Sequence, residues 1–335
     1  MKLSICIPTY NRKDKIPNCL NSIYLASKNS NLEFDVCISD NGSDYDLFTV
    51  IKEFDKKLNI KINQNKFNQG YMSNLLKTIS LSESEFVWAI GDDDLLMPNS
   101  LKKIEKIFYE NNDVDFFFLN SYSLDYKYLA NFPTPFDTKN LPKNMEFKLG
   151  NKKDSHQLKF WELIDYNISF DFLIGNFLNV FNRKMWKDNL HHLDQDLVRD
   201  TRTWSNFDNT VGHTKIYANA FKNSKAYYCA EGFTVNCLGV REWKDLYPFI
   251  EIVRLPEVLD YYRKNGLSFK SYIINKNYAL RNFFNYMLKI IFLGKNGGLQ
   301  YLNIYRHVFL NLIYPNVYLS LVYFIYRKIR NLFKH

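Results

Sequence analysis

Disulfide patterns and metal-binding cysteine patterns are missing from this sequence of 335 residues. Its five cysteines are odd in number and widely spaced, and the spacing matches no metal-ligand motif. Three of them fall in apolar segments, as reduced core cysteines of a cytosolic protein do. Only Lys2 precedes the first apolar segment, which ends at Pro8, so we expect no signal peptide. No internal repeat is present.

Acidic residues are missing from the last part of the chain. Residues 256–335 hold 12 Lys and Arg against Glu257 and Asp260, and nothing acidic follows Asp260. The first 255 residues keep 32 of the 44 basic and 33 of the 35 acidic side chains, so they are nearly neutral. The formal net charge of +9 therefore belongs to the C-terminal segment, which also contains 18 Tyr and Phe.

Three interpretations of this basic, aromatic segment remain open. Residues 308–326 carry no formal charge but are interrupted by Asn311, Pro315 and Asn316, which weakens a membrane-spanning helix. A helical cap packed on the rest of the chain explains the apolar positions. An anchor at an anionic membrane surface explains both the aromatic and the basic residues, and we favour it. Nucleic acid is not expected as a partner, because no recognition motif accompanies the charge.

The N-terminal third alternates strand and helix patterns with short connections. Apolar runs predict strands over 3–7, 34–38, 60–62, 86–90 and 114–119, and helical spacing predicts helices over 13–26, 47–54, 72–79 and 101–108. Such repeats imply a mainly parallel sheet covered by helices on both faces. Ligands bind such sheets at the carboxyl ends of the strands, where this sequence places polar loops.

The pattern weakens after residue 125. A proline-containing connection over 125–149 is either a lid or an ordinary surface excursion. Beyond it, the sequence predicts helices over 160–166 and 214–221 and strands over 172–180, 226–229 and 233–238.

Three consecutive carboxylates are the most informative local feature. Asp92, Asp93 and Asp94 follow the fourth predicted strand. Like charges this close repel, so the arrangement costs stability unless a cation is bound. Mg²⁺ and Mn²⁺ prefer oxygen ligands, which they share between carboxylates and substrate phosphates. The alternative is a solvated acidic turn in which Asp94 or Asn99 caps the next helix.

Four motifs at successive strand ends together resemble the nucleotide-binding half of family 2 glycosyltransferases with the A-type fold: residues 4–12, 38–43, 65–74 and 91–98. The resemblance covers about residues 1–120 and continues more weakly to about residue 245. Within the family, the chain is similar to abequosyltransferase-like O-antigen enzymes. It implies a Rossmann-like α/β three-layer sandwich with a helical, basic C-terminal extension. The expected divisions are a nucleotide-sugar half at 1–122, an acceptor half of the same domain at 123–255, and the extension at 256–335.

The resemblance also implies the residues of a donor site. It assigns nucleotide contacts to Pro8, Thr9, Tyr10, Arg12, Asp40, Asn65 and Asn74, with Asp40 accepting hydrogen bonds from the base. It assigns the metal, Mn²⁺ or Mg²⁺, to Asp93 and the following Asp94. Gly91 stands where the family's Asp-x-Asp motif usually begins, and Asp92 is expected to take over that aspartate's role toward the ribose.

Glycosyl transfer also needs a general base for the acceptor hydroxyl, which the family places in the second half. Candidates are Asp208, His213 and Asp171. Asp208 and His213 precede a predicted helix and could project into the cleft, but Asp208 also fits a helix cap and His213 a hydrogen-bonded surface residue. Trp243 fits either an acceptor-lining or a packing residue.

The sequence therefore predicts a metal-assisted glycosyltransferase. It would move a sugar from a nucleotide-sugar donor to a hydroxyl of a lipid-linked bacterial surface glycan such as O-antigen or capsule, by inverting displacement. We expect it to be cytoplasmic and peripheral on the inner face of the membrane. A non-catalytic glycan- or lipid-binding scaffold and a nucleotidyltransferase are the alternatives, although residues 4–12 lack the glycine-rich loop typical of the latter.

Overall fold

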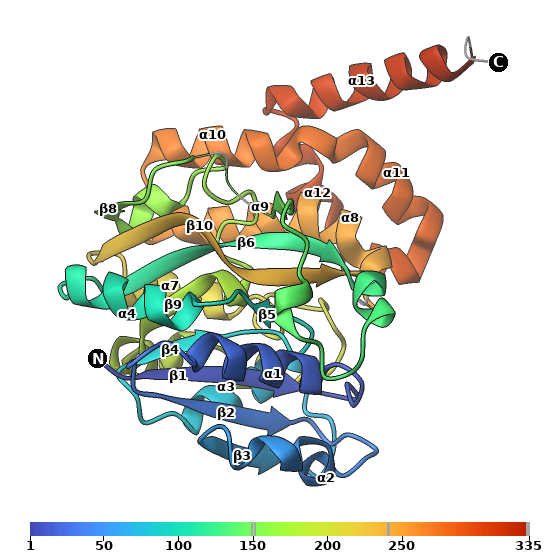
Figure 1. The fold of residues 1–335 in the computed structure, drawn as a ribbon. Helices are drawn as coiled ribbons and strands as arrows, with labels where there is room; N and C mark the ends of the chain where they lie inside the picture. Colours follow the sequence, from blue (N-terminus) through green and yellow to red (C-terminus); the bar gives the residue numbers. More distant parts are fainter. Residues whose placement is uncertain (149, 151, 240–241, 333–335) are drawn as a thin grey trace.

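The computed structural model (Figure 1) describes residues 1–148, 150, 152–239 and 242–332. One mixed sheet runs through them in the order β3-β2-β1-β4-β9-β6-β10-β5, with β7 beside β6 and β8 beside β10. The strands are β1 (Leu3–Thr9), β2 (Phe34–Asp40), β3 (Ile60–Gln64), β4 (Phe86–Ala89), β5 (Leu95–Leu96), β6 (Phe116–Asp125), β7 (Glu146–Phe147), β8 (His156–Lys159), β9 (Asn179–Asn182) and β10 (Lys225–Leu238).

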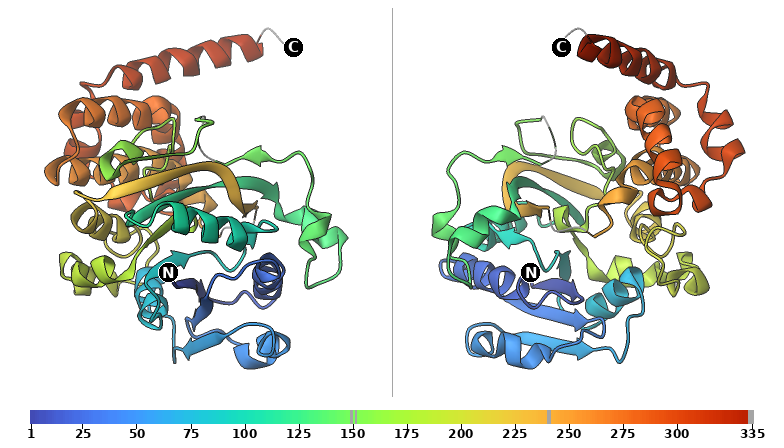
Figure 2. Two further views of the ribbon diagram at one scale, coloured as in Figure 1. Left: turned by 60° about the vertical axis from the view of Figure 1, so that its left-hand side comes forward. Right: turned by 90° about the vertical axis from the view of Figure 1, so that its right-hand side faces the viewer.

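Helices cover both faces of this sheet, so the predicted α/β three-layer architecture is confirmed (Figures 1 and 2). The α-helices are α1 (Ile16–Ser27), α2 (Leu47–Ile51), α3 (Tyr71–Ser80), α4 (Ser100–Glu110), α5 (Arg183–Asp188), α6 (Gln195–Val198), α7 (His213–Ala220), α8 (Tyr247–Phe249), α9 (Leu255–Lys264), α10 (Phe269–Ala279), α11 (Phe283–Leu293), α12 (Ile304–His307) and α13 (Pro315–Leu332). A π-helical turn at Ile250–Arg254 joins α8 to α9.

Side chains of β1 alternate between two cores. Leu3, Ile5 and Ile7 are fully buried in a core shared with α1 and α4. Cys6 points the other way, into a core shared with α3, α7 and α9. This period of two is what a strand covered on both faces requires.

The four N-terminal strands, which belong to the predicted donor half, are parallel and in register. β1 pairs with β2 and β4, and β2 pairs with β3, all in parallel, so Thr9 lies beside Asp40 and Asp40 beside Gln64. Their carboxyl ends therefore meet at one edge, as predicted. The whole sheet is less parallel than predicted, because β9 runs antiparallel between β4 and β6.

The predicted boundary at residue 122 falls inside β6. This strand continues to Asp125 and pairs in parallel with β10. The predicted strands 226–229 and 233–238 are one strand, β10, with a bulge around Gly232 where the register shifts. A side chain at Gly232 would overlap the Tyr122 ring, since its Cβ would lie 2.3 Å from that ring. The division of the sheet into donor and acceptor halves stays a prediction.

Two secondary-structure predictions for the second half are wrong. Phe172 and Leu173, predicted to begin a strand, have φ angles of 51° and 71°, so extended backbone starts only at Asn179. The predicted helix over 160–166 is a short 3₁₀ turn, Phe160–Leu163.

The connection over 125–149, of which Leu149 lies outside the described residues, packs on α1. The backbone N–H of Phe136 donates to Asn18 Oδ1 (2.7 Å), and Asn21 Nδ2 donates to the Phe136 carbonyl (2.9 Å). Phe136 itself is buried. These contacts fit the surface excursion better than the lid.

Helices α10 to α13 gather at the end of the molecule opposite β2 and β3 (Figures 1 and 2). Within the described residues, no single helix has the length and apolarity to cross a membrane. Ile304–Asn311 and Pro315–Arg330 reach that length and composition only as a pair, and they are bent by 87°. The uncharged run 308–326 is therefore broken where Pro315 starts a new helix.

Candidate functional site

A cavity of about 420 Å³ opens where the strand ends of the donor half meet the second half. It contains eight of the residues predicted for donor and metal: Pro8, Thr9, Tyr10, Arg12, Asn74, Asp92, Asp93 and Asp94. Residues from the second half close it, among them Asp171, Asn176, Trp204, Asn236, Trp243 and Glu251. All four predicted loops therefore contribute to the cavity lining. The loop over 38–43 does so with Asn41 rather than with the predicted Asp40.

Asp92 is held at the floor of the cavity by a neighbouring loop. Its carboxylate accepts a hydrogen bond from Thr9 Oγ1 at 2.7 Å. Burial, followed by repulsion from Asp93, raises the pKa of Asp92 to about 7. A carboxylate this poorly solvated is stabilised by a nearby cation, which restores its charged form.

Asp94 is fixed by the protein rather than by solvent. Its Oδ2 accepts from the Gly91 N–H (3.0 Å) and its Oδ1 from Asn236 Nδ2 (2.8 Å), and the side chain is buried. A Cβ at Gly91 would lie 2.8 Å from Asp93 Oδ1 and 2.9 Å from Asp94 Oδ2. The glycine at the usual place of the motif's first aspartate therefore leaves room for the two later carboxylates.

The donor set suits a hard divalent cation that is shared with a ligand. Asp92 and Asp93 line the same cavity, and burial followed by repulsion from Asp93 raises the pKa of Asp92, so a nearby cation would favour its charged form. Among the described residues, no group of three or more His, Cys, Asp or Glu side chains could hold a metal by itself. The remaining ligands would have to come from substrate phosphates or water.

Two predicted nucleotide contacts lie behind the cavity wall. Asp40 is fully buried and accepts from Ser43 and Gln64, and Asn65 donates to Asn41 Oδ1 (3.2 Å). Neither lines the cavity. Asn41, the neighbour of Asp40, does line it. Their side chains hold the loop in this structure, and the direct nucleotide contact expected of both residues stays a prediction.

Three hydrogen bonds to Ser39 and Asn65 hold the Asn74 side chain at the cavity wall. Its Nδ2 donates to the Ser39 carbonyl (2.8 Å), while its Oδ1 accepts from Ser39 Oγ (2.8 Å) and Asn65 Nδ2 (3.1 Å). Helix α3 carries it, and Gly70 precedes this helix with a φ of 86°. Few side chains other than glycine adopt that conformation, so Gly70 sets where α3 begins.

Asp208 and His213, the predicted catalytic bases, lie outside the cavity lining. Asp208 is fully buried, forms an ion pair with Lys215 (2.5 Å) and accepts from the Asp194 N–H (2.8 Å). His213 begins α7 and packs edge-on against Tyr217 in the core, where burial lowers its pKa to about 4. Neither side chain projects into the cavity, contrary to the expected position, and the assignment of either residue as the base stays a prediction.

Asp171, the third candidate base, does line the cavity. Ser169 Oγ and the Leu173 N–H (3.2 Å) donate to its Oδ1, and the Gly175 N–H donates to its Oδ2 (3.1 Å). Burial raises its pKa, although these hydrogen bonds act in the opposite direction. The left-handed backbone at Phe172 and Leu173 makes the loop tight enough to supply both N–H groups.

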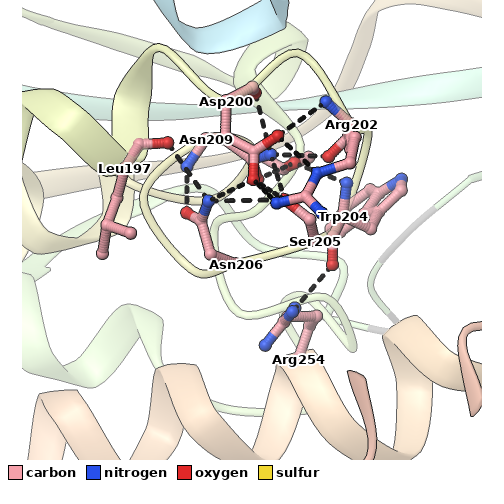
Figure 3. Close-up of polar contacts among 9 residues, drawn as sticks. Leu197, Asp200, Arg202, Trp204, Ser205, Asn206, Asn209 and Arg254 are labelled. Atoms are coloured by element: carbon pink, nitrogen blue, oxygen red, sulfur yellow. Dashed lines mark hydrogen bonds and ion pairs between the residues drawn. The ribbon is translucent and has the colours of Figure 1, made fainter. Parts of the chain in front are cut away.

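A loop over residues 200–210 supplies Thr201, Thr203, Trp204 and Thr210 to the cavity lining. Polar contacts cross-link this loop (Figure 3). Arg202 binds both carboxylate oxygens of Asp200, at 2.9 and 2.7 Å, and thereby lowers the Asp200 pKa. Asn209 Nδ2 donates to the backbone carbonyls of both residues, at 3.1 and 2.6 Å. Trp204 from this loop stands edge-on to Trp243, with ring centroids 5.5 Å apart.

The walls contributed by the second half were only partly visible in the sequence. Trp243 both lines the cavity and packs on the core, so its role toward an acceptor stays a prediction, and Glu242 pairs with Arg12 at 3.7 Å. Trp204 and Asn236 carry no local motif, and only the fold brings them to the aspartates.

Comparisons with known proteins agree with this geometry. Residues 4–161 match the family model for Glycosyl transferase family 2. The match spans slightly less than half of the chain. This family 2 region is 35% identical over 116 residues to the abequosyltransferase RfbV of Salmonella typhimurium, an alignment covering 34% of each protein. It is 32% identical over 104 residues to the poly(ribitol-phosphate) beta-N-acetylglucosaminyltransferase TarS of Staphylococcus aureus, covering 30% of this chain and 18% of TarS.

Solved structures extend the likeness in fold beyond the family 2 region. TarS residues 1–349 in complex with UDP superpose with a TM-score of 0.58 at 16% identity, covering 85% of this chain and 72% of that one. A mannosyltransferase from Pyrobaculum calidifontis, in complex with GDP-Man and Mn²⁺, has a TM-score of 0.51 at 13% identity and covers 99% of this chain and 87% of that one. The glycosyltransferase A-type fold is thereby confirmed.

Proposed function

We propose that this protein transfers a sugar from a nucleotide-sugar donor to a hydroxyl of a bacterial surface glycan. The observation that carries the proposal is the convergence of Thr9, Asn74 and Asp92–Asp94 on one cavity in a family 2 region. The names of the relatives support it, since one is an abequosyltransferase and another acts on poly(ribitol-phosphate). Solved neighbours bind UDP and UDP-GlcNAc.

Asp93 would hold Mn²⁺ or Mg²⁺ together with the donor phosphates. The sequence assigned the second ligand to Asp94, but both Asp94 oxygens accept hydrogen bonds from the protein, so the proposal gives that role to Asp92 instead of the ribose contact expected of it. When bound, such a cation acts as a Lewis acid that offsets the charge developing on the leaving diphosphate. Hydrogen bonds from Asn236 and Gly91 occupy the Asp94 carboxylate, so we do not assign it as a ligand of the cation. A hydrogen bond from Thr9 orients Asp92.

Asp171 is the residue we assign as general base. It is the candidate that reaches the cavity, and its raised pKa favours taking a proton from a hydroxyl. The proton of the acceptor hydroxyl would pass to the Asp171 carboxylate as the oxygen attacks the anomeric carbon. A single displacement of this kind inverts the configuration at that carbon.

The acceptor would be lipid-linked and the protein peripheral at the inner face of the membrane. Exposed apolar side chains gather on α12, α13 and the turn between them, among them Phe309, Ile313, Tyr318, Val322, Ile325 and Tyr326. Basic side chains accompany them, and no acidic residue follows Asp260. An interfacial helix combines these two properties.

Donor hydrolysis and thermal stabilisation by a panel of nucleotide sugars with Mn²⁺ test the proposal. One of them should raise the unfolding free energy by about 2.7 kcal/mol at a hundredfold excess over Kd, and should be hydrolysed slowly without acceptor. NMR of the product anomer would then test inversion. If no nucleotide sugar stabilises the protein or is hydrolysed, the proposal is wrong.

A further inference from the structure

A second cavity, of about 300 Å³, lies between α11 and α13 at the C-terminal end of the molecule. Four cationic side chains line it: Arg281, Lys289, Arg327 and Lys328. Asn282, Asn285 and Ser320 add polar groups, and Tyr323 and Phe324 form an apolar side. Among the described residues its lining contains no carboxylate. A concave site with this composition suits a phosphate-bearing ligand.

The cationic residues are positioned rather than scattered. Arg281 stacks on Tyr278, with its guanidinium carbon 4.3 Å from the ring centroid, and pairs with the buried Glu251 at 3.5 Å. Lys289 lies over Tyr286, and Lys328 over Phe324, at 5.3 and 5.7 Å. Glu251 neutralises Arg281 from behind, so three positive charges remain for a ligand.

A third cavity, of about 430 Å³, stands between this cationic cavity and the catalytic one. It shares Trp243 and Tyr247 with the catalytic cavity and Lys289 with the cationic cavity. Glu251 makes a second connection, because it lines the catalytic cavity and binds both Arg281 and Asn282, which line the cationic one. The walls are therefore continuous from the aspartates to α13.

We propose that the cationic cavity binds the phosphate or diphosphate group of a lipid-linked acceptor. The sugar chain of that acceptor would pass Trp243 and Tyr247 to reach the catalytic cavity. The exposed apolar side chains of α13 would meet the lipid on the outer side of the same helix. The acceptor role in this inference rests on the proposed function, whereas the phosphate site itself stands on the geometry of the cavity.

The test compares two triple variants of equal charge change. The pocket triple is Lys289→Ala/Arg327→Ala/Lys328→Ala, which spares Arg281 because of its pair with Glu251. The control triple is Lys264→Ala/Lys270→Ala/Lys295→Ala, three basic residues of the same segment that do not line the cavity. Binding of the full-length protein is measured on vesicles that contain a polyprenyl diphosphate, on phosphatidylglycerol vesicles of equal surface charge, and to inorganic pyrophosphate with EDTA present.

The pocket triple should bind polyprenyl-diphosphate vesicles about tenfold more weakly than the control triple, while both bind phosphatidylglycerol equally. Inorganic pyrophosphate should displace the wild type and the control triple, whose cavity lining is unchanged, from the polyprenyl-diphosphate vesicles but not from the phosphatidylglycerol vesicles. An equal loss in both triples on both vesicles would show diffuse attraction and overturn the proposal. If the pocket triple loses pyrophosphate binding but the wild type shows no preference between the two kinds of vesicle, the ligand is a soluble diphosphate and the proposed lipid-linked ligand is wrong.

Donor hydrolysis separates this inference from the proposed function. The pocket triple should hydrolyse the nucleotide sugar as fast as the wild type, because none of its three positions lines the catalytic cavity. If the wild type hydrolyses no donor but keeps the vesicle preference, the proposed function fails and the phosphate site stands.

Discussion

Arg254 donates a hydrogen bond of 2.7 Å to the backbone carbonyl of Trp204, and so ties the catalytic cavity wall to the start of α9 (Figure 3). Arg254 also pairs with Glu257, to which Arg306 and His307 of α12 bind at 3.3 and 3.1 Å. His307 Nδ1 accepts from the Asn303 N–H, so Nε2 carries the proton given to Glu257. One buried carboxylate thus joins the C-terminal helices to the cavity.

Glu257→Gln should lower stability in a pH-dependent way. Burial opposes ionisation, but the His307 hydrogen bond and the two arginines hold the Glu257 pKa at about 2. Because the folded pKa lies below the unfolded one, the stabilisation is present above about pH 4.5 and is lost as pH falls toward 2. Urea unfolding should show a deficit of about 3 kcal/mol at pH 7 that shrinks below pH 4.5. A deficit independent of pH would contradict the assignment.

Asp93→Asn should abolish Mn²⁺-dependent donor hydrolysis and leave the fold intact. The change removes a negative charge from the cavity, so a loss of about 10²-fold or more in kcat is expected. Asp196→Asn, an exposed aspartate on α6, is the matched control and should keep full activity. Full activity of the Asp93 variant would show that its carboxylate holds no metal.

Asp171→Asn should lower kcat by about 10²- to 10⁴-fold without changing thermal stabilisation by the donor. Because burial raises the pKa of Asp171, the wild-type rate should fall on the acid side as the carboxylate takes up a proton. The variant should lack this acid limb. Loss of donor binding in the variant would instead indicate a positioning role.

Asp208→Asn tests whether Asp208, which lies outside the cavity lining, is nonetheless the general base. It breaks the buried pair with Lys215, so the unfolding free energy should drop by about 3 kcal/mol. The kcat of the folded fraction, measured well below the melting temperature, should stay near the wild-type value. A loss of kcat as large as that of Asp171→Asn would restore Asp208 as the base.

Tyr326→Glu should weaken binding to anionic vesicles by about tenfold, because it places a charge on the exposed apolar side of α13. Tyr109→Glu on α4 is the control, since Tyr109 is also exposed but lies on the family 2 region. Flotation with phosphatidylglycerol vesicles measures both. Equal losses in the two variants would show that α13 is no contact surface.

The donor half was largely predictable because its signals are local. Parallel pairing of β1 with β4 brings Thr9 and the aspartates to one edge, and α3 adds Asn74. The positions of Asp40 and Asn65 behind the cavity lining were not predictable, because a sequence motif does not show whether a polar side chain faces a ligand or holds its loop.

The second half depends on contacts far apart in sequence. Asn236 donates a hydrogen bond to Asp94, which lies 142 positions earlier in the sequence. A glycine is needed at position 91 because a Cβ there would clash with the carboxylates of Asp93 and Asp94. The loop of Asp171 was predicted as a strand because Phe172 and Leu173 are apolar. Their left-handed backbone conformation cannot be read from the sequence. Tertiary packing overrides local pattern at all three places.

The gathering of α10–α13 at the end opposite β2 and β3 makes the molecule electrically lopsided (Figure 2). Such a molecule has a large dipole moment, and the field of an anionic bilayer exerts a torque on it within a Debye length, about 8 Å at physiological salt. If the protein attaches to a membrane as proposed, it would rotate toward the orientation in which α10–α13 face the surface before it makes contact. Raising the ionic strength should slow arrival at the bilayer far more than it slows any chemical step.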